Sequence, residues 1–217
     1  MTALFPDRRQ AGRMLADMLE PLGLHEPVVL ALPRGGVPLG LEIARRLRAP
    51  MDLLFVRKIG APGHQEYGIG ALVDGASPKI VIDRDAAQAT GASTAYIQQQ
   101  VARELGEIER RRSAYQTGAP VDLRGKTIIV VDDGIATGGT VRAALSALEQ
   151  SGAAQVVLAV PVAARDVLAS LRALCDRVVC LATPVPFIAV GAHYGNFAQV
   201  TDAEVVEDLL AAHAAIG

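Results

Sequence analysis

The feature that most constrains the fold of this chain is a series of short, continuous apolar runs separated by segments with helical periodicity. The runs are "VVLAL" (28–32), "MDLLFV" (51–56), "TIIVVD" (127–132), "AQVVLAVPV" (154–162) and "DRVVCLA" (176–182). Unbroken apolar runs of this length are typical of strands that are covered on both faces. Helical patterns lie between them, at 39–47, 140–152 and 164–174. This alternation predicts an α/β fold, a Rossmann-like parallel sheet flanked by helices, with right-handed crossovers.

In a sheet of this kind, ligands bind beyond the carboxyl ends of the strands. The loops that follow Leu32, Val56, Val131 and Leu181 are therefore expected at one edge of the sheet. Since these loops hold nearly all of the unusual chemistry in the chain, the sequence predicts a ligand site at that edge.

The segment "VVDDGIATGGT" (130–140) places two acids, Asp132 and Asp133, directly before a loop of glycine, alanine and threonine. Between a parallel strand and a helix N-terminus, such a loop presents unpaired backbone N–H groups and favours an anion. It lacks the lysine of a P-loop, which argues against a nucleoside triphosphatase. Carboxylates beside a phosphate are explained if the ligand also carries a diol or a magnesium ion, as a sugar phosphate does. The alternative is that the acids only end a strand and cap a turn.

Several other segments carry weaker signals. The stretch "RKIGAPGHQEYGIGA" (57–71) is rich in glycine and poor in apolar anchors, which predicts a mobile loop. "ALVDGASPKIVID" (71–83) predicts a hairpin that turns at Asp74-Gly75. Residues 93–115 predict a long helix with a basic end, and Asp7 is expected to cap the first helix.

Composition excludes several classes of protein. The 217 residues are enough for one α/β domain, and 21 Lys and Arg against 23 Asp and Glu give no sign of a nucleic-acid surface. No apolar run approaches the roughly 20 residues of a membrane span, and the first ten residues do not form a signal peptide. We therefore expect a cytoplasmic protein without membrane or nucleic-acid partners.

Three of these segments resemble the type I phosphoribosyltransferases. "VVDDGIATGGT" resembles the signature with which that family binds phosphoribosyl diphosphate (PRPP), and "LPRGGVP" (32–38) is similar to its pyrophosphate loop. "RKIGAPGHQEYG" (57–68) is similar to its flexible catalytic loop, above all in adenine phosphoribosyltransferases. The resemblance implies a single domain over residues 1–217, with a core at about 28–182 and a hood at about 183–202 plus the terminal helices.

The resemblance also implies an activity: transfer of the 5-phosphoribosyl group of PRPP to a nitrogenous base, with release of pyrophosphate. Mg²⁺ would be held mainly by the substrate, with Asp132 and Asp133 as candidates for contact through water. A homodimer and a non-proline cis peptide bond in the 32–38 loop are implied as well. The implied substrate-binding residues are Arg34, Gly35, Gly36, Asp132, Asp133, Gly134, Ile135, Ala136, Thr137, Gly138, Gly139 and Thr140, and the implied catalytic residues are Arg57, Lys58, Glu66 and Tyr67.

Two departures from the family leave the acceptor base open. Ala136 stands where 6-oxopurine enzymes have an aspartate, which argues against a hypoxanthine or guanine enzyme. The hood segment does not obviously match that of the adenine enzymes. Phe187, Ile188 and Tyr194 are expected to flank a flat acceptor there, with simple packing as the alternative for Phe187. His193 is expected to be a surface or loop histidine, with a role in the site as the alternative.

Two other functions stay open from the sequence. A regulator of the same fold that senses PRPP or a nucleotide, without transferase activity, would be indicated by a basic face or a damaged catalytic loop. The sequence shows neither, since Arg57, Lys58, Glu66 and Tyr67 are all present. A diphosphokinase that forms PRPP would need an adenine-nucleotide site and usually a longer, duplicated chain, so a length of 217 residues argues against it. The fold by itself separates none of these functions.

Overall fold

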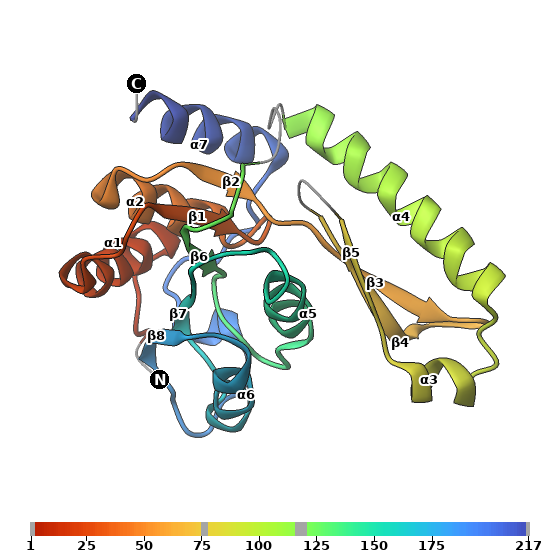
Figure 1. Cartoon of the computed structure of the whole chain (residues 1–217). Helices are drawn as coiled ribbons and strands as arrows, with labels where there is room; N and C mark the ends of the chain where they lie inside the picture. The colour runs from red at the N-terminus through yellow and green to blue at the C-terminus, as the bar shows by residue number, and fades with distance from the viewer. Residues whose placement is uncertain (1–2, 75–77, 116–120, 216–217) are drawn as a thin grey trace.

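The computed structural model describes residues 3–74, 78–115 and 121–215, apart from the side chain of Glu66 (Figure 1). Its main element is a five-stranded parallel sheet in the order β2-β1-β6-β7-β8. The strands are β1 (Pro27–Ala31), β2 (Met51–Leu53), β6 (Thr127–Val131), β7 (Gln155–Val162) and β8 (Arg177–Ala182). The predicted α/β fold with a parallel sheet is confirmed.

The two faces of this sheet are covered by different helices. Alternate strand residues such as Val29 and Ile129 pack in one apolar core with α1 (Arg8–Leu19), α2 (Val37–Leu47) and α7 (Asp202–Ala214). Their neighbours Val28 and Ile128 pack in a second core with α5 (Gly139–Leu148) and α6 (Arg165–Leu171). Because successive side chains of a strand point to opposite faces, each unbroken apolar run supplies both cores. Short 3₁₀ turns complete the chain at η1 (Glu20–Leu22), η2 (Arg172–Leu174) and η3 (Val190–His193).

The first helix begins as the sequence predicts. The side chain of Asp7 accepts a hydrogen bond from the backbone N–H of Gln10 at 2.8 Å, which satisfies one of the unpaired donors of the first turn. The helix then tightens into η1, and Gly23 ends it in the left-handed conformation at φ 58°.

The predicted strand at 51–56 is wrong in its length. The strand β2 ends at Leu53, and a new strand starts at Val56 and leaves the parallel sheet. Leu54 and Phe55 are nevertheless buried, since Leu54 enters the second core and the ring of Phe55 stacks on Tyr115 at 6.1 Å between ring centroids. An apolar run therefore continues through a buried connection that is not a strand.

The glycine-rich stretch 57–71 is likewise not an irregular loop. It lies in β3 (Val56–Ala61) and β4 (His64–Val73), which pair antiparallel with each other. The other edge of β4 pairs antiparallel with β5 (Lys79–Ile82), so the three strands form a second sheet in the order β3-β4-β5. The glycines are required by close strand approach: a Cβ at Gly60 would lie 2.7 Å from Cα of Gln65, and a Cβ at Gly70 would lie 2.7 Å from Cδ1 of Ile82. The pairing of β4 with β5 confirms the hairpin predicted at 71–83, and residues 75–77 of its turn lie outside the described residues.

Figure 1 shows that this second sheet projects from the core together with α3 (Arg84–Ala89) and α4 (Thr94–Tyr115). We call these elements, from Val56 to Tyr115, the arm. A separate small core of Ile59, Ile69 and Val101 holds the arm together. No helix of the described residues is long and apolar enough to cross a membrane.

The base of the arm is fixed to the parallel sheet by a buried charge cluster. Arg112 of α4 contacts the carboxylate of Asp74 at 2.6 Å and that of Asp52 at 3.5 Å, and its guanidinium lies 5.7 Å from the ring centroid of Phe55. Burial raises the pKa of Asp52, and Arg112 opposes this shift. The far end of α4 is thereby held against the core.

Candidate active site

The loops after β1 and β6 lie side by side at the carboxyl edge of the parallel sheet. The two strands are direct neighbours, and the N–H of Leu32 donates to the carbonyl of Val131 at 2.9 Å where both strands end. Each loop leads into a helix, β1 into α2 and β6 into α5. Two helix N-termini therefore point toward the same edge, an arrangement that favours anionic ligands.

The loop from Gly134 to Thr140, here called the anion loop, encloses a pocket of about 160 Å³. The pocket is lined by Asp132, Gly134, Ile135, Ala136, Thr137, Gly138, Gly139, Thr140, Val141 and Val190. Gly138 adopts φ 76° and is the N-cap of α5, so the first turn of that helix faces the pocket with its backbone donors. The anion loop thus has the shape and the donors that a phosphate group requires.

The two acids at the head of this loop form a coupled pair. Asp132 accepts a hydrogen bond from the backbone N–H of Asp133 at 2.9 Å, and both residues are half-buried. Burial and, second, the charge of Asp133 raise the pKa of Asp132 to about 8. Burial also raises the pKa of Asp133, although Arg8 opposes this shift. Hydrogen-bond donors or a divalent cation between the acids would offset this cost, so the donor set fits both a ribose diol and Mg²⁺.

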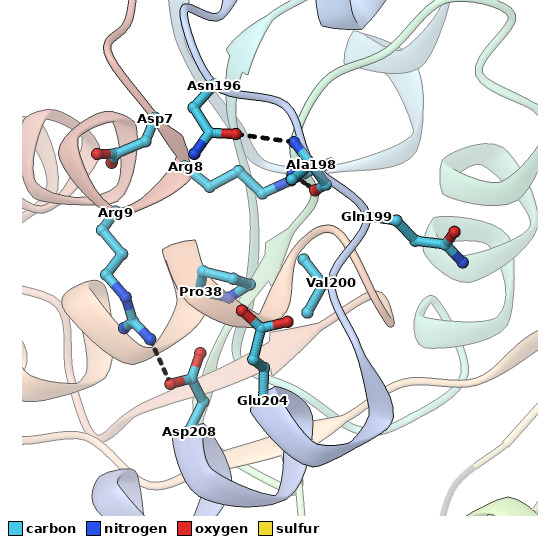
Figure 2. A pocket seen from close by; sticks show the side chains of 10 residues that line it. All are labelled: Asp7, Arg8, Arg9, Pro38, Asn196, Ala198, Gln199, Val200, Glu204 and Asp208. Carbon is cyan, nitrogen blue, oxygen red and sulfur yellow. Dashed lines mark hydrogen bonds and ion pairs between the residues drawn. The ribbon is translucent and has the colours of Figure 1, made fainter.

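Asp133 is held by Arg8, to which the sequence did not point, and by Tyr194, which was expected in another role. Arg8 of α1 donates to its Oδ2 from Nε at 2.9 Å and contacts the same oxygen with Nη2 at 2.8 Å. The guanidinium of Arg8 also lies 3.8 Å from the ring centroid of Phe197 and donates to the carbonyl of Ala198 at 2.7 Å. Figure 2 shows Arg8 crossing from α1 toward Ala198. The hydroxyl of Tyr194 donates to the backbone carbonyl of Asp133 at 2.6 Å.

The loop after β1 packs directly against the acid pair. A Cβ at Gly35 would collide with the carboxylate of Asp133, and one at Gly36 would lie 2.5 Å from the carbonyl oxygen of Val131. Glycine is therefore required at both positions for this close approach. The Pro33-Arg34 peptide is cis, as the family resemblance implies.

The expected catalytic residues lie on the arm, and among the described residues none of them lines the anion-loop pocket. Arg57 in β3 donates from Nε to the carboxylate of Glu104 in α4 at 2.6 Å. Lys58 is exposed, Tyr67 is 53% exposed, and the side chain of Glu66 lies outside the described part of the chain. Their catalytic roles stay predictions.

The hood segment differs from expectation at two residues. Tyr194 and His193 are buried, at 6% and 5% exposure. The ring of Phe5 packs 5.4 Å from that of Tyr194, and the N–H groups of Leu4 and Phe5 donate to the carbonyl of His193. Tyr194 therefore holds the backbone of Asp133, and its contact with an acceptor stays a prediction, whereas His193 is not a surface residue. The ring of Phe187 is half-buried, 5.3 Å from that of His193, whereas Ile188 is 68% exposed. Their contact with an acceptor stays a prediction.

Comparison with known proteins identifies the class of protein. Residues 8–195 match the family model described as "Phosphoribosyl transferase domain". The chain belongs to this family, in its type I group, as the acid pair and the anion loop predict.

Individual relatives extend the match over most of the chain. A Mycobacterium tuberculosis (strain H37Rv) protein named "Putative phosphoribosyl transferase Rv0571c" is 44% identical over 211 residues, which are 97% of this chain and 47% of the relative. "Bifunctional protein PyrR" of Gloeothece citriformis is 46% identical over 151 residues, 69% of this chain and 64% of the relative. The crystal structure of the protein TT1426 from Thermus thermophilus is 42% identical with a TM-score of 0.83, covering 95% of this chain and 97% of that one. The chain spans about half the length of the mycobacterial relative.

Proposed function

We propose that this protein transfers the 5-phosphoribosyl group of PRPP to a nitrogenous base and releases pyrophosphate, with Mg²⁺ as cofactor. One arrangement carries the proposal: an acid pair stands between the anion loop on one side and the turn at Gly35-Gly36 on the other. A ligand with a phosphate, a diol and a diphosphate in that order would match these three features.

In this proposal each loop takes one part of PRPP. The anion loop binds the 5-phosphate, Asp132 and Asp133 accept from the ribose hydroxyls, and Arg34 with the Gly35-Gly36 turn binds the diphosphate. Mg²⁺, when bound, neutralises the diphosphate and takes most of its ligands from the substrate. Fixed positive charge beside the leaving group and exclusion of water would lower the barrier to cleavage of the ribose C1–O bond.

The remaining parts of the proposal concern the acceptor and the assembly. The acceptor base would lie beside Phe187 and Ile188 of the hood, and Ala136 provides no carboxylate to accept a proton from it. Arg57, Lys58, Glu66 and Tyr67 would act on the leaving group and cover the site. We further propose one phosphoribosyltransferase domain over residues 1–217, acting as a homodimer.

The proposal is tested by calorimetric titration of PRPP with and without Mg²⁺ into the wild-type protein and into Asp132→Asn/Asp133→Asn. We expect binding that requires Mg²⁺ and is lost in the double variant, because both acids then lose their charge. A screen of nitrogenous bases for pyrophosphate release would follow. Absence of PRPP binding by the wild-type protein, shown to be folded by circular dichroism, would refute the proposal.

A second candidate, a sensor of PRPP or a nucleotide without transferase activity, is favoured by the state of Arg57. Its ion pair with Glu104 ties it to α4, so in this conformation it does not serve a leaving group at the acid pair. A protein that binds PRPP but releases no pyrophosphate with any base would support the sensor.

A further inference from the structure

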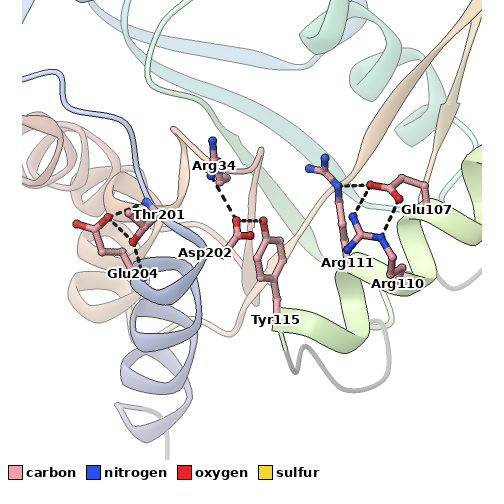
Figure 3. Close-up of polar contacts among 8 residues, drawn as sticks. All are labelled: Arg34, Glu107, Arg110, Arg111, Tyr115, Thr201, Asp202 and Glu204. Carbon is pink, nitrogen blue, oxygen red and sulfur yellow. Dashed lines mark hydrogen bonds and ion pairs between the residues drawn. The ribbon is translucent and has the colours of Figure 1, made fainter.

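A pocket of about 200 Å³ lies at the junction of the arm and the core. It is lined by residues of the β1–α2 loop, of α4 and of α7, namely Arg34, Arg110, Arg111, Ala114, Tyr115 and Asp202. Figure 3 shows side chains from these three elements, which are far apart in the sequence, meeting in one place. Three guanidinium groups around a small pocket favour an anionic ligand, because their planar forks match phosphate oxygens.

Glu107 neutralises part of this charge, but unequally. Its carboxylate accepts from both Nε and Nη2 of Arg110, at 2.9 and 2.8 Å, and only from Nε of Arg111, at 3.0 Å. Figure 3 shows the terminal nitrogens of Arg111 turned away from Glu107. Arg111 is therefore the arginine of α4 that is better placed to donate to a ligand in the pocket.

Asp202 provides the second carboxylate and stands beside Arg34. It accepts from the hydroxyl of Tyr115 at 2.7 Å, and it forms an ion pair with Arg34 at 3.4 Å. The hydrogen bond from Tyr115 lowers the pKa of Asp202, so this group is an anion at neutral pH. The ion pair between Arg34 and Asp202 is weak, because it is 3.4 Å long and the Asp202 side chain is 69% exposed. A ligand anion can therefore readily replace Asp202 beside Arg34.

The pocket and the candidate active site share one short loop, the connection between β1 and α2. Arg34 faces the pocket, and the next residue, Gly35, lies against the carboxylate of Asp133. A diphosphate bound at Gly35 would therefore lie beside Arg34, which lines the pocket together with Arg110 and Arg111 of α4.

We infer that this pocket is a phosphate-binding site in which α4 contributes to recognition of the diphosphate, with Arg111 and Arg34 donating to the same group. The inference rests on the proposed function for the identity of the ligand and deepens it. Asp202 occupies the place beside Arg34 until the diphosphate displaces it. Ligand binding would thereby link the arm to the active-site loop.

The test is titration of inorganic pyrophosphate, in buffer with a chelator and at fixed ionic strength, into the 217-residue chain and three variants. Arg111→Gln is expected to weaken binding by about tenfold, the usual effect of losing a charge-assisted hydrogen bond. Arg103→Gln is the matched control, since Arg103 is exposed on the same helix and does not line the pocket. Asp202→Asn is expected to strengthen binding severalfold, because it removes the competing carboxylate.

Equal effects of Arg111→Gln and Arg103→Gln would show a general charge effect and overturn the inference, as would absence of pyrophosphate binding by the wild-type chain. Circular dichroism of each variant separates loss of binding from loss of fold. Titration of PRPP with Mg²⁺ into the same variants separates the inference from the proposed function. If Arg111→Gln binds PRPP as tightly as the wild-type chain does, the inference is overturned and the proposed function is not. If pyrophosphate binding depends on Arg111 but the wild-type chain does not bind PRPP, the transferase proposal is overturned and the inference is not.

Discussion

At the scale of single residues, Arg8 is the side chain whose role is most sharply defined. It is the cation that offsets the charge of Asp133, and its side chain is only 11% exposed. We predict that Arg8→Ala lowers the free energy of unfolding by about 2–3 kcal/mol, because a half-buried carboxylate loses a charge-assisted hydrogen bond and its ion-pair partner. PRPP affinity should fall as well, since Asp133 is no longer held in place. Urea unfolding and calorimetry measure the two effects.

Arg13→Ala is the matched control for this prediction. Arg13 lies on the same helix with its side chain 50% exposed, and its ion pair with Glu42 is 3.5 Å long. The change in the free energy of unfolding should stay within roughly 0.5 kcal/mol, as for exposed ion pairs in general. Similar losses in the two variants would mean that Arg8 matters only as part of α1.

At the scale of elements, what the sequence predicts depends on how far apart the interacting residues are. The strands of the parallel sheet and the anion loop follow from local patterns, and each was found within a few residues. The contact of Arg8 with Asp133 spans 125 positions and leaves no trace in either local pattern. The stretch 57–71 of the arm looks like a loop in the sequence, because glycines that permit close strand approach cannot be told there from glycines that permit mobility.

Two glycine substitutions distinguish these uses of glycine in the arm. Gly70→Ala places a Cβ 2.7 Å from Cδ1 of Ile82 and closer still to the carbonyl of Val81, so β4 and β5 must separate. Gly106→Ala lies within α4 with no atom near the added Cβ, and it should stabilise the arm by about 0.5–1 kcal/mol. Opposite signs are expected in thermal unfolding and in amide exchange of α4. A neutral Gly70→Ala would contradict the close pairing of β4 with β5.

At the scale of the whole molecule, the acid pair makes the stability of the ligand-free, metal-free protein depend on pH. The pKa of Asp132 is raised from 3.8 to about 8, so between these values the folded protein keeps a proton that the unfolded chain has released. The unfolded state then binds fewer protons, and the free energy of unfolding falls as pH rises through this window. It levels off above pH 8. Urea unfolding in the presence of a chelator, from pH 4 to 9, measures the slope.

Asp132→Asn assigns that slope to one group. The variant should be more stable than the wild-type protein at pH 8, and the gap should close toward pH 4, because Asp132 becomes protonated in both states only below its ordinary pKa of 3.8. Asp122 supplies a control of the opposite sign, since Arg124 lowers its pKa to about 2 and its stabilisation is lost only as pH falls below its ordinary value of 3.8. A gap that does not change with pH would show that Asp132 is ionised in the empty site. If the wild-type protein becomes more stable than Asp132→Asn once PRPP and Mg²⁺ are added, ligand binding supplies the partners that the two adjacent carboxylates lack in the empty site.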